Sequence, residues 1–206
     1  MSLEGEHDEL PLFPLRTVLF PDGLLELKIF EARYLDLMSR CMREQLPFGV
    51  VALKSGTEAR VSDDPVELYD AGTLAELIEV DSAQAGILLV RARGTRRFTL
   101  GATRQRSDGL WVGRASELAP DEIVAPGLAH GNVVKSLVDA VATLTAQGAE
   151  PFLKPHRFDS AGWVANRWCE ILPVPLEGKQ RLMTFANPLG RLGVIDTFMR
   201  SQQTTH

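Results

Sequence analysis

LPLFPLRTVLFPDGLLELKIFEARYLDLMSRCMREQL, residues 10–46, is the stretch that decides the fold of the N-terminal half of the chain. Two prolines near its start favour extended backbone, because the pyrrolidine ring fixes φ in the region shared by strands. The short apolar segment 18–20 then meets Pro21-Asp22-Gly23, a sequence typical of tight turns. We therefore expect residues 24–29 to fold back on 18–20 as the second strand of a hairpin.

A helix is predicted directly after this hairpin, over residues 31–45, because apolar residues recur there at steps of three and four. The apolar positions are Tyr34, Leu35, Met38, Cys41 and Met42. Methionine is flexible and polarizable, and methionines on a helix are suited to hydrophobic peptide grooves. Met38 and Met42 are therefore candidate peptide contacts, with packing in the core as the alternative interpretation.

Short strands dominate the sequence from there to residue 117. A strand is expected over 47–53, followed by a polar loop over 54–70. Turn residues, including the pair Gly94-Thr95, separate four further segments with strand character. These strands are predicted over 73–81, 87–93, 97–104 and 110–116. Their close spacing, with one early helix, predicts a closed or half-closed antiparallel barrel.

The second half of the chain has helical periodicity. Residues 117–127 contain two prolines and several acids, as linkers do. Helices are expected over 133–144, over 163–171 after a cap at Asp159 or Ser160, from Pro175, and from Asn187-Pro188 to about Arg200. The predicted fold is α+β. A strand-rich subdomain, 1–117, precedes a helical bundle subdomain, 118–206, that is mainly helical over 127–202.

The composition is that of a globular protein, with 206 residues, 45% hydrophobic and 24% charged. The N-terminus is acidic and lacks an apolar core, so we expect no signal peptide. Apolar runs are far shorter than a membrane span, and a cytoplasmic protein without membrane contact is predicted. Cys41 and Cys169 both fall on apolar helix faces, which favours buried thiols over a disulfide or a nucleophile.

An ordered series of motifs resembles the substrate-binding (N-terminal) domain of ATP-dependent Lon protease. The opening PLFPLRTVLFP is followed by a turn and then by IFEARY. Further matches in order are Phe48-Gly49-Val50-Val51, Gly72-Thr73-Leu74-Ala75, Gly94-Thr95-Arg96-Arg97-Phe98, Leu172-Pro173, the run from Gly178 to Met183, and Pro188-Leu189-Gly190-Arg191-Leu192. The resemblance covers about nine tenths of the chain. It implies a PUA-like β-barrel followed by helices, in a stand-alone copy of the domain.

The same resemblance implies a non-enzymatic module that binds unfolded or hydrophobic polypeptide segments. A protease or a chaperone would be its working partner, as for an adaptor, and self-association is a further expectation. No ATPase or peptidase motif accompanies it. A phosphate loop ending at Lys135-Ser136 would need glycine at Ala129 and Val134. Ser160 opens a predicted helix and lacks the context of a nucleophile.

No catalytic, cofactor-binding or metal-binding residues are predicted. The four histidines are scattered without ligand spacing, and neither a Cys-x-x-Cys nor a Gly-x-Ser-x-Gly pattern occurs. An unrecognised small-molecule site in a cleft stays open as a third interpretation.

Charge is segregated along the chain, whose net charge is -5. Between residues 91 and 114 there are seven arginines and one acid, Asp108. The candidate contacts for an anionic partner are Arg91, Arg93, Arg104 and Arg106. Arg91 and Arg93 are two residues apart and so share one face of a strand. Nucleic acid, as RNA, is the alternative partner for this basic hairpin. The competing interpretation is that these arginines pair with nearby acids and cover the sheet.

Overall fold

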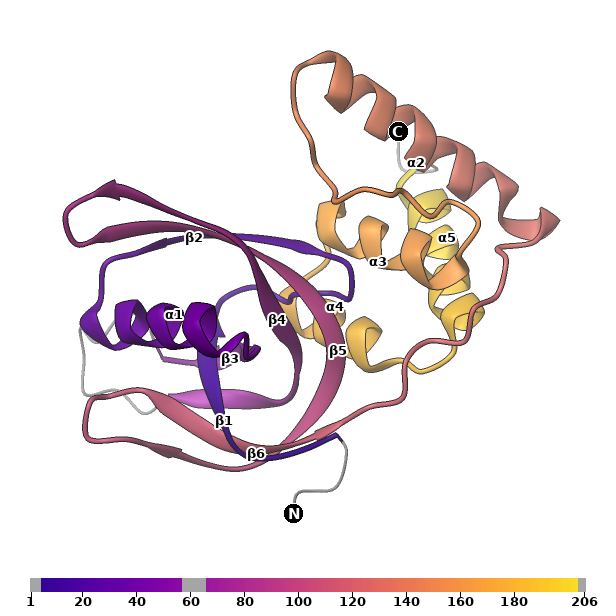
Figure 1. Ribbon diagram of the computed structural model, residues 1–206. Helices are drawn as coiled ribbons and strands as arrows, with labels where there is room; N and C mark the ends of the chain where they lie inside the picture. Colours follow the sequence, from indigo (N-terminus) through magenta and orange to yellow (C-terminus); the bar gives the residue numbers. More distant parts are fainter. Residues whose placement is uncertain (1–4, 57–65, 204–206) are drawn as a thin grey trace. The chain divides into compact units, whose positions relative to one another are not determined.

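The computed structural model describes residues 5–56 and 66–203, and the chain divides into two compact units, 1–119 and 120–206. The first unit contains six strands and one helix: β1 (Glu6–Leu15), β2 (Leu24–Ile29), α1 (Ala32–Glu44), β3 (Phe48–Ser55), β4 (Glu67–Gln84), β5 (Ile87–Gln105) and β6 (Trp111–Glu117). The second contains η1 (Leu128–His130), α2 (Gly131–Ala146), α3 (Ala161–Ile171), α4 (Leu176–Thr184) and α5 (Pro188–Gln203) (Figure 1). This is the α+β fold class that the sequence predicts.

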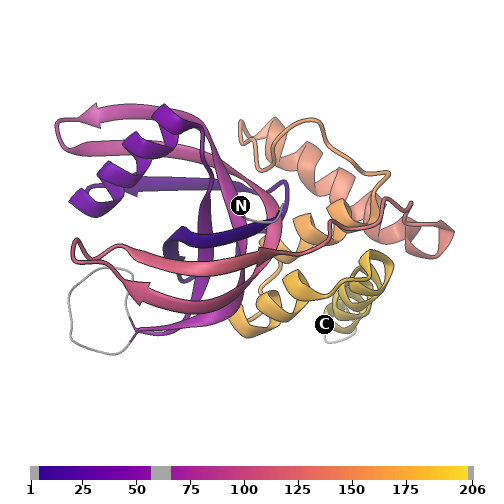
Figure 2. The same cartoon turned by 60° about the horizontal axis from the view of Figure 1, so that its bottom comes forward.

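The six strands form one sheet in the order β2-β5-β4-β3-β1-β6, and β6 also pairs with β5. The second pairing closes five strands into a ring, which corresponds to the predicted barrel, with β2 attached to the first half of β5 (Figure 2). All neighbours are antiparallel except β1 and β3, which are parallel. β5 is long enough to pair with three strands, because β2 and β4 flank its first half and β6 its second.

The predicted hairpin between residues 18–20 and 24–29 is wrong in its pairing. The turn itself is present, since Gly23 N donates to Phe20 O at 2.9 Å. However, 18–20 is not a strand, and β2 pairs with β5, with Leu25 opposite Ala92. Phe20 is fully buried as part of a loop. The apolar segment 18–20 therefore packs in the core and does not pair with another strand.

The predicted break at Gly94-Thr95 is also wrong, because β5 runs through it from Ile87 to Gln105. Gly94 is required for a close approach. A Cβ there would lie 2.3 Å from Phe20 O and 2.9 Å from Leu19 Cγ. Gly94 N donates to Gly23 O at 2.9 Å, and Gly94 O accepts from Asp22 N at 2.8 Å. The glycine lets the loop before β2 lie directly on the strand.

The predicted loop 54–70 is shorter than expected at both ends, because β3 continues to Ser55 and β4 begins at Glu67. Residues 57–65 of that prediction lie outside the described residues. β4 is an 18-residue strand, so the whole segment from 67 to 84 belongs to the sheet.

Two hydrophobic clusters form the core of the first unit. One lies between α1 and the sheet and includes Tyr34 and Met38 from α1, Leu25 and Ile29 from β2, and Ala92 from β5. Figure 1 shows α1 lying along this part of the sheet. The other lies around Phe98, which is fully buried inside the ring. The first cluster also includes residues of β1, β3 and β4, and it fixes α1 on this face of the sheet.

In the second unit two helices, α3 and α5, begin where the capping residues predict. The hydroxyl of Ser160 accepts a hydrogen bond from Trp163 N, and Asn187 Oδ1 accepts one from Gly190 N at 2.9 Å. Trp168 Nε1 donates to Val133 O at 3.1 Å and so ties α3 to α2. Over the ranges 5–56 and 66–203, no helix combines the length and apolar character that crossing a membrane requires.

Candidate functional site

The N-terminal end of α1 is fixed by an arginine. Arg33 donates to Gly109 O at 2.8 Å and pairs with Glu31 at 2.8 Å. Its guanidinium lies 4.6 Å from the centre of the Tyr34 ring, which in turn stacks on Phe13 at 4.0 Å. Cation–π and stacked aromatic contacts of this kind contribute stability beyond that from burial of apolar surface. These contacts give α1 a defined position on the sheet. Because a helix is rigid, the position of its C-terminal end is defined as well.

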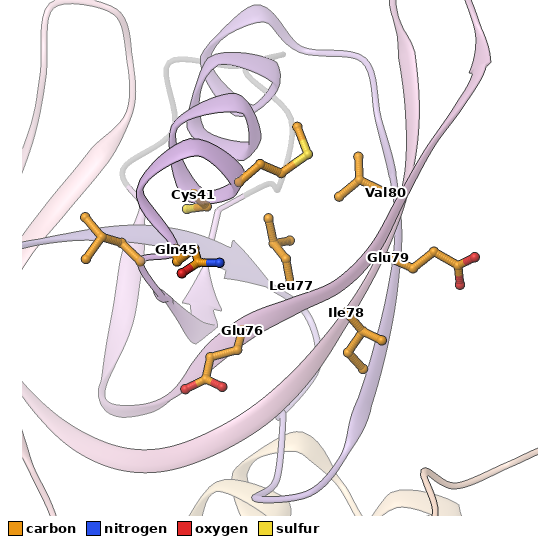
Figure 3. Close-up of a pocket in the computed structure, with 9 residues that line it drawn as sticks. Cys41, Gln45, Glu76, Leu77, Ile78, Glu79 and Val80 are labelled. Atoms are coloured by element: carbon orange, nitrogen blue, oxygen red, sulfur yellow. The ribbon is translucent and has the colours of Figure 1, made fainter.

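A groove of about 410 Å³ lies between the C-terminal turns of α1 and strand β4 (Figure 3). Its lining residues come from the end of α1 and the residue after its cap, and from five consecutive residues of β4: Cys41, Met42, Gln45, Leu46, Glu76, Leu77, Ile78, Glu79 and Val80. We call this the α1–β4 groove. Its volume falls within the range of small ligand sites and is enough for one or two large side chains.

A β-bulge shapes the strand side of the α1–β4 groove. The register between β4 and β5 shifts between Leu77 and Glu79, so strict alternation is interrupted at Ile78. Leu77 and Val80 consequently both point towards α1, while Ile78 and Glu79 point away from it (Figure 3). The bulge places two apolar side chains on the floor of the groove where an unbulged strand would place only one of them.

Large apolar side chains are exposed around the groove. Met42 is 47% exposed, Leu46 48% and Ile78 48%. Leu46 is exposed because α1 ends at Glu44 and the left-handed backbone of its C-cap, Gln45 (φ 52°), turns the chain out of the helix. Covering such exposed apolar side chains with a partner lowers the free energy, because their surface is removed from water. The arrangement is suited to reversible docking of apolar side chains.

Cys41, at the floor of the groove, is not a nucleophile. Its side chain is buried, and burial raises the pKa of the Cys41 thiol to about 11. Reactive cysteines have the opposite property, a lowered pKa in an exposed and electropositive setting. Cys169 is likewise buried, and burial raises its pKa to about 12. The prediction of two buried, unpaired thiols is confirmed.

The two candidate methionines are in different environments. Met42 lies at the rim of the α1–β4 groove and is half exposed. Met38, one turn earlier, is fully buried in the cluster beneath α1. Met38 therefore supports the helix from below, and Met42 is the one available to a partner.

The structure places the candidate arginines in ion pairs. Arg91 and Arg93 share one face of β5, as predicted, and Arg91 lies directly between Glu26 on β2 and Glu79 on β4, at 3.4 and 3.1 Å. The other pairs are Arg93 with Asp22, Arg96 with Glu117, Arg104 with Glu9, Arg106 with Asp108, and Arg114 with Asp8. Arg97 is buried and donates to Ala119 O at 3.0 Å. The basic stretch of sequence is thus neutralised locally by acids from other strands and from two turns, which carry Asp22 and Asp108.

A second apolar groove, of about 420 Å³, lies within the helical unit between α4 and α5. Its lining residues are Val174, Gly178, Arg181, Leu182, Phe185, Val194, Ile195 and Phe198. Phe185 and Val194 are 43% and 49% exposed. It carries one charged side chain, Arg181, which pairs with Glu177. In the described parts of the chain, no three potential metal-ligating side chains come together.

Sequence reasoning identified Met42 as a contact and Cys41 as a buried thiol. It missed the other lining residues of the α1–β4 groove, Leu46 and Ile78 among them. One signal was present in the sequence. The adjacent pair Leu77-Ile78, followed by Val80, breaks the alternation expected of a half-buried strand. The position of Leu46 depends on where α1 ends, and helix ends are poorly defined by periodicity.

A family model for the ATP-dependent protease La (LON) substrate-binding domain matches residues 9–200. A Lon protease from Xanthomonas oryzae pv. oryzae is 25% identical over 214 aligned residues, which cover 95% of this chain. A Lon protease from Parabacteroides distasonis is 25% identical over 188 residues, covering 88%. The chain spans only 24% and 22% of the length of these two curated relatives. The 206 residues hold the matched domain without an ATPase or peptidase domain.

Solved structures show the same similarity. A Lon N-terminal domain protein from Xanthomonas campestris superposes with a TM-score of 0.74 at 31% identity, covering 93% of this chain and 98% of that one. The N-terminal domain of Mycobacterium avium complex Lon protease gives a TM-score of 0.64 at 15% identity, with 91% and 96% covered. The second similarity concerns the fold alone.

Proposed function

Because the chain belongs to the family of the ATP-dependent protease La (LON) substrate-binding domain, we propose that it binds unfolded or hydrophobic polypeptide segments reversibly and without catalysis. The observation that carries the proposal is the α1–β4 groove, where Met42 and Leu46 are each about half exposed beside a hollow of about 410 Å³ whose floor includes Leu77 and Val80. A folded protein seldom leaves such side chains together unless a partner covers them.

The size of the groove implies weak binding by a single copy. Full burial of one large apolar side chain contributes about 1.5–3 kcal/mol, before the cost of association is subtracted. Linked copies raise overall avidity by about 10² to 10⁴ over one site. We therefore propose that the domain acts beside other sites, either as an adaptor to a protease or chaperone or through self-association.

Nucleic-acid binding has less support. The arginines of β5 and β6 pair with carboxylates, and Arg91 has glutamates on both neighbouring strands. A phosphate would have to compete with carboxylates that already occupy these positions. Because surface ion pairs are weak, a salt titration with RNA tests this competition directly.

The proposal is tested by titrating the protein into a fluorescently labelled, chemically unfolded model protein and, separately, into labelled single-stranded RNA, each at low and high salt. We expect saturable binding to the unfolded protein that changes little with salt, since burial of apolar surface is not screened. Binding to RNA alone, weakening steeply as salt rises, would refute the proposal in favour of the arginines.

A further inference from the structure

One edge of strand β4 has no strand partner where it borders the α1–β4 groove. On one side β4 pairs with β3 only as far as Ala75. On the other it pairs with β5 through to Gln84. Residues 76–84 therefore expose one edge, and within the described parts of the chain no recorded hydrogen bond from outside the sheet reaches them. The backbone N–H and C=O groups that point away from β5 are thus available to a partner.

The free edge and the groove coincide. The same five residues of β4 that line the α1–β4 groove, 76–80, belong to the unpaired edge. Met42 and Leu46 border the hollow beside them. A chain lying in the groove can therefore reach apolar side chains and unpaired backbone groups at once, which is the condition for recognition by strand addition.

The two faces of this edge differ in chemistry. Towards α1 lie the apolar side chains of Leu77 and Val80 (Figure 3). The opposite face carries carboxylates and one exposed apolar side chain, Ile78. Glu76 lies opposite Arg93 in register, and Asp81 lies opposite the exposed Leu89. No ion pair is recorded for the carboxylates of Glu76 and Asp81 among the described residues.

We propose that an extended polypeptide segment adds to β4 along residues 76–84 as a further strand. Because side chains alternate across a strand, one row would enter the α1–β4 groove and the other would lie beside Glu76 and Asp81. The recognised pattern is therefore apolar residues alternating with lysine or arginine. This inference rests on the proposed function and specifies its substrate class.

The test uses capped eight-residue peptides of alternating leucine and lysine, titrated into the full chain. Two controls carry N-methyl groups on the amides of all leucines or of all lysines. In an added strand, alternate amides face the neighbour. Methylation of one set should therefore weaken binding by about tenfold or more, since several hydrogen bonds are lost, and methylation of the other set should leave it within about twofold.

A charge variant supplies an independent readout. Glu76→Lys should weaken binding of the leucine–lysine peptide by about fivefold at low salt, less at high salt, and improve binding of a leucine–glutamate peptide. Glu76 is exposed, so the variant is expected to fold normally, which circular dichroism verifies.

Equal affinity of both methylated peptides, or equal loss for both, would overturn strand addition. So would binding of unfolded protein with no binding of any of these peptides. In each case saturable, salt-tolerant binding of unfolded protein would leave the proposed function standing. Absence of that binding would refute the proposed function itself.

Discussion

Replacing Gly94 with alanine is expected to destabilise the strand-rich unit by about 2–4 kcal/mol. The new methyl carbon would lie 2.3 Å from the carbonyl oxygen of Phe20, whereas non-bonded heavy atoms prefer about 3.5 Å. The neighbouring atom is backbone, so the loop before β2 has to move by about 1 Å. Overpacking of this kind costs about 1–3 kcal/mol.

The same displacement weakens two hydrogen bonds. Gly94 N donates to Gly23 O and Gly94 O accepts from Asp22 N, at 2.9 and 2.8 Å. Each contributes about 1 kcal/mol, and partial loss of both brings the total to the expected range. Gly101 in the same strand is the matched control, because a Cβ there meets only Arg114 O at 3.5 Å and Arg114 Cβ at 3.8 Å. Gly101→Ala should stay within about 0.5 kcal/mol of the wild type.

Urea denaturation followed by circular dichroism measures the free energy of unfolding of both variants. Their midpoints can be compared directly when the slope of that free energy against urea concentration is the same. The predicted result is a clearly lower midpoint for Gly94→Ala and an almost unchanged one for Gly101→Ala. If the two variants had the same stability, Gly94 would be an ordinary strand glycine, and the account of the loop lying on β5 would be refuted.

Further outcomes are expected at three sites: the Arg191–Asp121 pair, the two buried cysteines and Asp196. Arg191 is fully buried and pairs with Asp121, so Arg191→Met should cost about 3–5 kcal/mol by leaving the carboxylate without this partner, and adding Asp121→Asn should recover part of that loss in urea denaturation. Cys41 and Cys169 should react with a thiol reagent far more slowly in the native protein at pH 8 than in denaturant, and equal rates would contradict their burial. Since their raised pKa values keep both thiols neutral while unfolded thiols ionise near pH 8.5, stability should fall as pH rises above about 9, and less so in a double Cys→Ala variant. The hydrogen bond from Arg200 lowers the pKa of Asp196, so its contribution to stability is present at neutral pH and lost on acidification; Asp196→Asn should flatten the acid limb of the stability curve, and an unchanged limb would contradict this.

Local features of the sequence predicted the helices well. The prediction of a helix over 31–45 agrees with α1, which the structure places at Ala32–Glu44. Ser160 and Asn187 cap the helices they were expected to begin. Capping and helical periodicity involve residues only a few positions apart, so they can be recognised without knowledge of the tertiary structure.

Strand pairing was predicted less well, because it joins residues that are far apart in sequence. Residues 18–20 resemble a strand, yet they pack as a loop, and the partner of β2 lies about 65 positions further on, in β5. Gly94 looks like a break and is a contact point within a continuous strand. Recognising either requires knowing which segments come together in the closed sheet.

The candidate site was predicted in part. The helix pattern identified both methionines, with packing in the core as the alternative to a peptide contact; Met38 is in the core, and Met42 is half exposed. Ile78 and Leu46 depend on a bulge in β4 and on the end of α1, which sequence periodicity does not define. The basic stretch was visible in the sequence, whereas its neutralising partners, such as Glu26 for Arg91, come from other strands.

The most direct test of the account compares how tightly three versions of the chain bind the same labelled, unfolded protein. The versions are the wild type, the double variant Met42→Glu and Leu46→Glu in the α1–β4 groove, and the control Leu128→Glu, which adds charge at a fully exposed leucine of the helical unit. We predict that the groove variant binds about tenfold or more weakly, because two apolar contacts are lost, while the control binds as the wild type does. Equal binding by all three would contradict the assignment of the groove as the polypeptide-binding site.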